Sequence, residues 1–146
     1  MTQEEKQLLL QDLCARLPYG VIMTNKVLTE TYYPLDGNEY QQAYYDDNWD
    51  DVPYLRPMSS MTEEEEKEFS ILYGLKDILS IKITDKYIEV IVDDGFCSTE
   101  TRTIWYDEMI SSIEIFDWLN FHYFDYRNLI GRGLALEAPE GIYKTE

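Results

Sequence analysis

His122 is the only histidine in the chain, and two carboxylates lie near it in the sequence, Asp117 and Asp125. A carboxylate that accepts a hydrogen bond from one imidazole nitrogen can orient the other nitrogen for general base catalysis. We therefore take His122 and Asp125 as candidate catalytic residues. The alternative is a histidine at the boundary between two helices, because no Gly-x-Ser-x-Gly motif or reactive-cysteine context accompanies it. A single histidine also does not favour a His-based zinc site.

The segment YYDDNWDD, residues 44–51, could bind a metal ion. Asp46, Asn48 and Asp50 have the spacing of the first, third and fifth ligands of a calcium-binding loop. The match ends there, because the sixth position requires glycine and holds Asp51, and the twelfth requires glutamate and holds Pro57. A solvated acidic loop is the alternative interpretation, and we expect no bound cofactor.

The chain is strongly acidic, with 12 Lys and Arg against 29 Asp and Glu and a net charge of −17. Direct nucleic-acid binding is disfavoured, because it requires Lys and Arg clustered against the phosphates. An acidic surface instead favours basic protein partners, although solubility alone would also explain the charge. Thirteen tyrosines and an aromatic content of 14% argue against disorder.

The two cysteines, Cys14 and Cys97, are not in a Cys-x-x-Cys pair. Reduced thiols are the expectation for such a chain. The acidic N-terminal sequence is unlike a signal peptide, and no apolar run approaches the ~20 residues that cross a bilayer. We therefore expect a cytoplasmic protein without membrane association.

Two helices are predicted from their capping patterns. Residues 1–20 contain a capping-box pair, Thr2 and Glu5, and end at Pro18-Tyr19-Gly20. Four residues at helical spacing are expected to face the core, and Cys14 is then a buried thiol: Leu10, Leu13, Cys14 and Leu17. Residues 62–74 repeat the pattern with Thr62 and Glu65 and end at Gly74. Their expected inward residues are Phe69, Leu72 and Tyr73.

Residues 21–57 are expected to hold strands and the acidic loop. Two short strands joined by a turn are predicted within residues 21–33, followed by a turn at 34–38. Residues 52–57 contain two prolines and are predicted to be an extended connector. Arg56 is a lone cation there and is expected to form a structural ion pair.

Residues 78–106 have the period-two alternation of a three-stranded meander. The expected inward residues are Leu79, Ile81 and Ile83 in the first strand and Ile88, Val90 and Val92 in the second. Asp93-Asp94-Gly95 is a predicted turn, and residues 101–106 are the predicted third strand.

Residues 111–143 form the most aromatic segment, around which we expect the rest to pack. Ser111 and Glu114 form a third capping-box pattern. The expected apolar stripe of this helix comprises Ile113, Phe116, Leu119 and Tyr123, widened by Trp118 and Phe121. A second short helix is predicted at about residues 126–130 with Gly131 as its stop, followed by a short strand or docked tail at 134–137.

Three segments together resemble a group of small uncharacterised proteins from gut anaerobic bacteria and their mobile or prophage-like elements. They are LLLQDLCARLPYGV (8–21), VPYLRPMSSMTEEEE (52–66) and FDWLNFHYFDYRNLIGRGLALEAPEGIY (116–143). The resemblance implies that these segments form a shared scaffold. It implies no assigned activity, cofactor or catalytic residue.

The expected fold is a single α+β domain, with a small antiparallel sheet packed on one side against three to four helices. The leading functional hypothesis is a non-enzymatic, acidic interaction protein of a mobile element that binds a protein partner, such as a basic one. One alternative is a small carboxylate- or metal-dependent enzyme with a metal at Asp46, Asp47 and Asp50. Another is a structural homo-oligomer with an aromatic self-interface.

Overall fold

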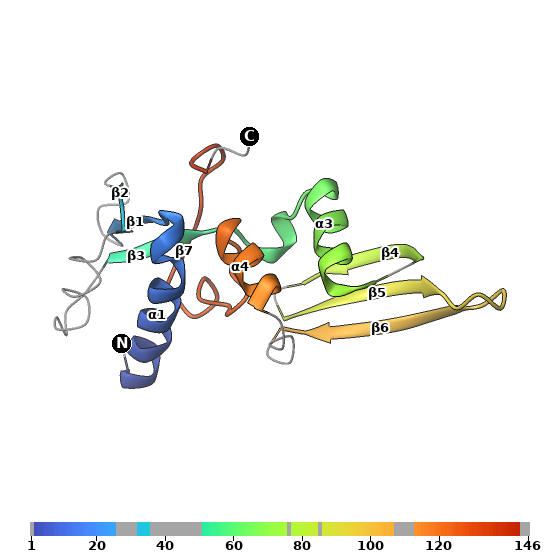
Figure 1. Cartoon of the computed structure of the whole chain (residues 1–146). Helices are drawn as coiled ribbons and strands as arrows, with labels where there is room; N and C mark the ends of the chain where they lie inside the picture. The colour runs from blue at the N-terminus through green and yellow to red at the C-terminus, as the bar shows by residue number, and fades with distance from the viewer. Residues whose placement is uncertain are drawn as a thin grey trace.

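The computed structural model describes residues 2–25, 32–35, 51–75, 77–84, 86–106 and 113–143. These residues form a mixed α+β structure with two separate sheets, and Figure 1 shows α4 between α1 and the second sheet. The α-helices are α1 (Gln3–Arg16), α3 (Glu63–Tyr73) and α4 (Ile113–Phe121). The strands are β1 (Ile22–Asn25), β2 (Tyr32–Pro34), β3 (Asp51–Leu55), β4 (Ile78–Ile83), β5 (Tyr87–Asp93), β6 (Thr99–Trp105) and β7 (Leu136–Glu137). No helix among these residues is long and apolar enough to cross a membrane.

Two of the predicted capping boxes are confirmed. The Glu5 backbone N–H donates to Thr2 Oγ1, and the Thr2 N–H donates to the Glu5 carboxylate at 2.8 Å. Thr62 and Glu65 make the same reciprocal pair at the start of α3, and Gly74 ends that helix with a φ of 81°. The third pattern involves Ser111, which lies outside the described residues. These caps satisfy backbone donors that a helix start leaves without partners.

The helix α1 is rotated relative to the predicted stripe. Its buried residues are Leu9, Leu10, Asp12, Leu13 and Arg16. Cys14 is exposed, so the prediction of a buried core thiol was wrong. The reason is that a buried ion pair between Asp12 and Arg16 occupies the inward face, and apolar spacing gives no sign of such a pair.

The first sheet has the order β2-β1-β3-β7. β1 pairs antiparallel with β2, as expected for two short strands, although Pro34 lies in β2 and not in the predicted turn. β1 also pairs antiparallel with β3, and β7 pairs parallel with β3. Residues 52–57 are therefore more than a connector, because most of them lie in β3. Pro53 is tolerated there because β7 pairs only with Tyr54 and Leu55, which leaves Pro53 with a strand neighbour on one side.

The second sheet is the predicted meander, with the order β4-β5-β6. Ile88, Val90 and Val92 of β5 are buried, as the alternation predicted. In β4 the prediction failed at Leu79, which is 60% exposed. A register irregularity between Ile78 and Ser80 leaves Leu79 without a partner on β5, and Ile78 packs on the core instead.

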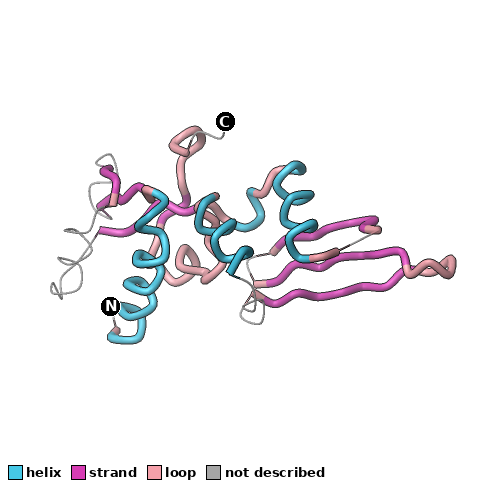
Figure 2. The backbone as a smooth tube through the Cα atoms, viewed as in Figure 1, coloured by secondary structure: helices cyan, strands magenta, loops and turns pink. Residues whose placement is uncertain are grey.

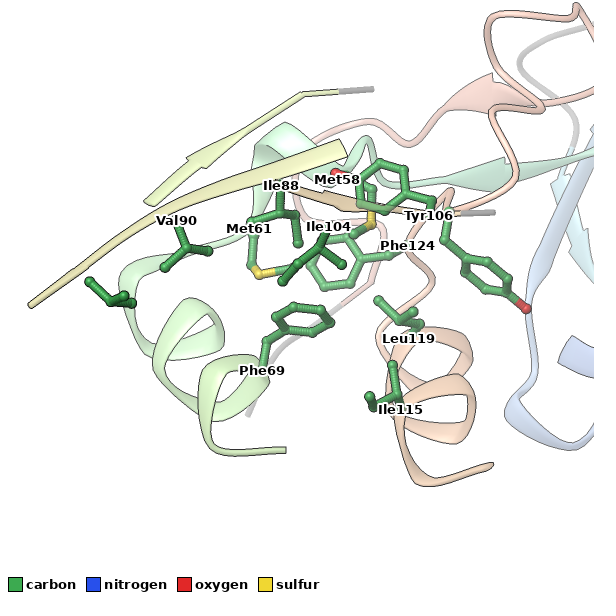
Figure 3. Close-up of a cluster of buried hydrophobic side chains, with 12 residues drawn as sticks. Met58, Met61, Phe69, Ile88, Val90, Ile104, Tyr106, Ile115, Leu119 and Phe124 are labelled. Carbon is green, nitrogen blue, oxygen red and sulfur yellow. The ribbon is translucent and has the colours of Figure 1, made fainter. Parts of the chain in front are cut away.

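Side chains from α3, α4 and the second sheet converge on the larger of two apolar clusters (Figure 3). Phe69 of α3 and Leu119 of α4 meet Ile88 and Ile104 of the sheet there. The smaller cluster joins α1 to the first sheet through Leu9, Leu13, Val21, Met23, Leu35, Leu55, Leu129, Leu134 and Ala135. The expectation of one antiparallel sheet is thus replaced by two small sheets, each with its own cluster.

The C-terminal segment contains α4 as predicted, but the second short helix is absent. Residues 126–133 form turns (Figure 2), and Asn128 adopts a left-handed φ of 57° that interrupts helical geometry. The short strand predicted near residues 134–137 is confirmed as β7. Ile113 and Phe121 were expected to face inward, yet they are 79% and 60% exposed. Leu119 is buried as predicted, and Phe116 and Trp118 pack against the larger apolar cluster. Ile115 and Asn120, which were not in the predicted stripe, are also buried.

Candidate functional site

The predicted calcium-loop residues Asp46, Asn48 and Asp50, together with Asp47, lie outside the described residues. Within the described ranges, no group of three or more His, Cys, Asp or Glu side chains is arranged to hold a metal ion. The candidate metal site is therefore a prediction that the structure leaves untested.

The two candidate catalytic residues have different partners. The Asp125 carboxylate accepts hydrogen bonds from the backbone N–H groups of Leu129 at 2.8 Å and Ile130 at 2.9 Å. His122 lies directly after α4, and its Nδ1 is 3.2 Å from Oε2 of Glu65 on α3. The carboxylate that orients the imidazole thus comes from α3, more than fifty positions away, and not from the nearby Asp125.

Glu65 is shared by several groups at once. Arg56 donates to both of its carboxylate oxygens, at 2.7 and 2.8 Å, which confirms the predicted structural ion pair. The Thr62 N–H donates to the same carboxylate at 3.0 Å. The Arg56 guanidinium also lies 4.3 Å from the centre of the Phe124 ring. The cluster fastens the end of β3, the start of α3 and the end of α4 to one another.

Glu65 and His122 both have pKa values that the cluster shifts. Burial alone would raise the pKa of Glu65, but hydrogen bonds from Arg56 and Thr62 outweigh it and hold the pKa below its ordinary value. Desolvation has the largest effect on His122 and lowers its pKa, against the nearby carboxylates that raise it. At neutral pH the imidazole is therefore uncharged, and the Glu65 carboxylate is ionised and occupied by Arg56.

A different feature stands out at the far end of the second sheet, where the hairpin between β5 and β6 projects away from the helices (Figure 1). We call residues 77–79 and 93–100 the sheet tip. Its two segments are joined, because Ile78 and Glu100 both pair with Val92 of β5, and the Asp93 N–H donates to the Asp77 carbonyl. The sheet tip therefore brings one end of β4 beside the hairpin.

Side chains within the hairpin fix its shape. Asp93 Oδ1 accepts from the Gly95 N–H at 2.9 Å, and Asp94 Oδ1 accepts from the Phe96 N–H at 2.8 Å. The Ser98 hydroxyl also donates to Asp94, and these bonds hold the pKa of Asp94 below its ordinary value. The turn is thus organised by its own carboxylates, as Asp residues commonly do in turns.

This fixed turn holds Phe96 in solvent, with 88% of its surface exposed. The Asp93-Asp94-Gly95 turn was predicted from the sequence, but the exposure of Phe96 was not. The available signal was a large apolar residue directly after a turn, at a position with no strand alternation. Comparisons of the chain with protein-family models, with curated proteins and with solved structures found no match.

Proposed function

We propose that this protein is a non-enzymatic interaction protein that binds a basic protein partner through the sheet tip. The observation that carries the proposal is Phe96, a large apolar side chain held in solvent at the end of a projecting, internally bonded hairpin. Exposing an aromatic ring of this size forfeits its burial energy, which a partner's apolar pocket would restore. The turn is already ordered, so binding would cost little further conformational entropy.

The charges around Phe96 support a basic partner. Exposed carboxylates in the sheet tip comprise Asp77, Asp93, Asp94 and Glu100. The nearby Arg102 lies 3.5 Å from Glu100 and offsets only part of this charge. A partner surface with an apolar pocket rimmed by Lys and Arg would complement both features, and its association would weaken with salt.

The resemblance to mobile-element proteins of gut anaerobes suggests what kind of protein the partner is. We propose a host or phage protein in the cytoplasm as the partner, with the acidic sheet tip occupying its nucleic-acid-binding surface by charge mimicry. Such a surface is basic because it must neutralise phosphates, which explains why an acidic protein would fit it.

The test is affinity capture from a lysate of a gut anaerobe, with the tagged protein as bait and washes at low and high salt. The comparison uses wild type, Phe96→Ala, and Ile71→Ala as the matched control, because Ile71 is 77% exposed on α3. We expect wild type and Ile71→Ala to retain the same basic protein. Phe96→Ala should lose it, and high salt should release it.

Equal capture by wild type and Phe96→Ala would reject the sheet tip as the binding surface. Retention that is insensitive to salt would reject the charge mechanism. Light scattering of wild type and Phe96→Ala distinguishes a third outcome, in which Phe96 mediates association between copies of this chain and supports the homo-oligomer alternative instead.

A further inference from the structure

A cleft of about 870 Å³ opens between α1, α4, the near end of the second sheet and the loop at residues 126–132. We call it the junction cleft. Its volume is within the range of roughly 300–1,000 Å³ typical of small-molecule sites. It lies far along β5 and β6 from the sheet tip, because Lys86, Trp105 and Tyr106 line it at the opposite end of these strands.

Positive charge is concentrated in the junction cleft. Among the described residues that line it, Lys86, Arg127 and Arg132 are basic and Asp117 is the single acidic one. This ratio is the reverse of the whole chain, which carries 12 basic and 29 acidic residues. Among the residues that the structure describes, neither Lys86 nor Arg132 has a side-chain hydrogen bond or ion pair, and Arg127 reaches only Asp12, at 3.5 Å. Within the described parts of the chain, Lys86 and Arg132 therefore have no counter-charge and are available to an anion.

A buried amide supplies a second polar group. Asn120 lines the cleft although only 4% of the residue is exposed. The Tyr126 hydroxyl donates to its Oδ1 at 3.0 Å, which fixes the orientation of the amide. Nδ2 of Asn120 then has no partner in the described parts of the chain. This nitrogen is accessible, so it can donate to a ligand or a water molecule in the cleft.

Aromatic rings line another part of the cleft. Trp105, Phe116 and Tyr126 line the cleft, and the rings of Phe116 and Tyr126 lie with their centres 5.4 Å apart. The Arg127 guanidinium lies 5.1 Å from the centre of the Tyr126 ring. Aromatic and guanidinium planes of this kind stack on flat heterocycles, and the amide of Asn120 can bind a heterocycle's polar edge.

From these three features we infer that the junction cleft binds a free nucleotide, with its phosphate on Lys86 and Arg132 and its base among the aromatic rings. A simple anion would satisfy the cations but would leave most of the volume and the rings unused. A polynucleotide is disfavoured, because its continuing phosphates would meet the acidic surface of a chain with a net charge of −17. The inference is independent of the sheet tip and of its partner.

The test is isothermal titration of the full chain with AMP, GMP, CMP and UMP, each beside its own nucleoside and beside inorganic phosphate. We expect at least one nucleotide to bind about tenfold or more tightly than its nucleoside or phosphate, because it satisfies both halves of the cleft. Arg132→Ala should weaken that binding by about tenfold or more, as loss of a charge-assisted contact does.

Two lysines of the same sheet provide the matched comparison. Lys86→Met should weaken nucleotide binding, whereas Lys82→Met should not, because Lys82 is exposed on β4 and does not line the cleft. The inference is overturned if none of the four nucleotides binds, if phosphate or nucleoside alone binds as tightly, or if the Lys86 and Lys82 variants behave alike. Phe96→Ala should bind the nucleotide normally, which separates this test from that of the protein partner.

Discussion

At the scale of single residues, Glu65 shows how one carboxylate can hold several segments together. It caps α3, pairs with Arg56 beside β3 and accepts from His122 after α4. The side chains of Glu65 and Arg56 are only 8% and 15% exposed, so water screens their interaction weakly. The ordinary helix cap that the sequence predicted is also the anchor of a buried polar cluster.

Glu65→Gln should therefore lower the free energy of unfolding by about 2–3 kcal/mol. The substitution preserves shape and one acceptor, but it leaves the Arg56 charge without its counter-charge. Urea denaturation measures the effect, with Glu64→Gln on the exposed face of the same turn as the control. Equal losses in the two variants would contradict a special role for Glu65.

His122 should make stability depend on pH in a defined direction. Desolvation lowers the pKa of His122 in the folded chain below the ordinary 6.5. The unfolded chain therefore binds a proton at His122 more readily than the folded chain does. The contribution of the uncharged His122 to the free energy of unfolding is therefore fully present above pH 6.5 and declines as the pH falls below that value. His122→Gln should flatten the change in unfolding free energy between pH ~7.5 and ~5.5. An unchanged pH profile in the variant would contradict this assignment.

Carboxylates with raised pKa act in the opposite direction. Burial raises the pKa of Asp125, and burial together with repulsion from Glu63 raises that of Glu66. The folded chain takes up these protons first, so these two groups favour folding as the pH falls. Comparing wild type with His122→Gln at each pH subtracts this background and isolates the histidine.

At the scale of elements, β4 shows how one irregularity overrides a repeating pattern. The alternation of residues 78–84 predicted Leu79 to face the core, but the irregularity shifts that role to Ile78. Similarly, the end of α4 is followed by turns rather than a second helix, with the Asp125 side chain bonded to the Leu129 and Ile130 N–H groups. Apolar spacing encodes neither the irregularity in β4 nor the side-chain bonds of Asp125.

The two faces of the second sheet should accordingly respond differently to truncation. Leu79→Ala should change the free energy of unfolding by no more than about 0.5 kcal/mol, as exposed substitutions commonly do. Ile88→Ala, in the buried face of β5, should lower it by about 2–5 kcal/mol through lost burial and a cavity. Chemical denaturation of both variants measures this, and comparable losses would place Leu79 in the core after all.

At the scale of the whole molecule, a buried ion pair lies where the two apolar clusters meet. Arg16 Nε donates to Asp12 at 2.8 Å, and Arg16 Nη2 donates to the Phe124 carbonyl at 2.6 Å. Phe124 belongs to the larger cluster, whereas Leu9 and Leu13, which lie on α1 together with Arg16, belong to the smaller one. Arg16 thus links α1 to the chain that follows α4 and supports one wall of the junction cleft.

Arg16→Met should lower the free energy of unfolding by about 3 kcal/mol, because it leaves the buried Asp12 with only the longer contact to Arg127, at 3.5 Å, as counter-charge. The double variant Asp12→Leu/Arg16→Met should recover most of this loss, since no unpaired charge is then left fully buried. Thermal and urea unfolding of both variants test this. A double variant as unstable as the single one would show that the Phe124 bond, not the charge pair, is what matters.

The sequence by itself determined the local elements with strong signals. Capping boxes at Thr2 and Thr62, the stop at Gly74 and the alternation of β5 depend on interactions within a few residues or on repeating periods. The exposed Phe96 and the rotation of α1 were beyond such signals, because both depend on which distant surfaces are available for packing. The two functional proposals depend still more on contacts between residues that are far apart in the sequence.

Only the tertiary structure decided which polar and aromatic side chains lie close together. Glu65 contacts Arg56 and His122, and Lys86, Arg132 and Asn120 line one cleft, across separations that no motif spans. In the sequence the basic residues are scattered among more numerous acids, so their clustering around aromatic rings is invisible. Folding brings these basic and aromatic residues to one cleft by placing the turn after Asp125 beside α1, α4 and the end of the second sheet. Linear spacing reports local geometry, whereas long-range packing determines which side chains share a cleft.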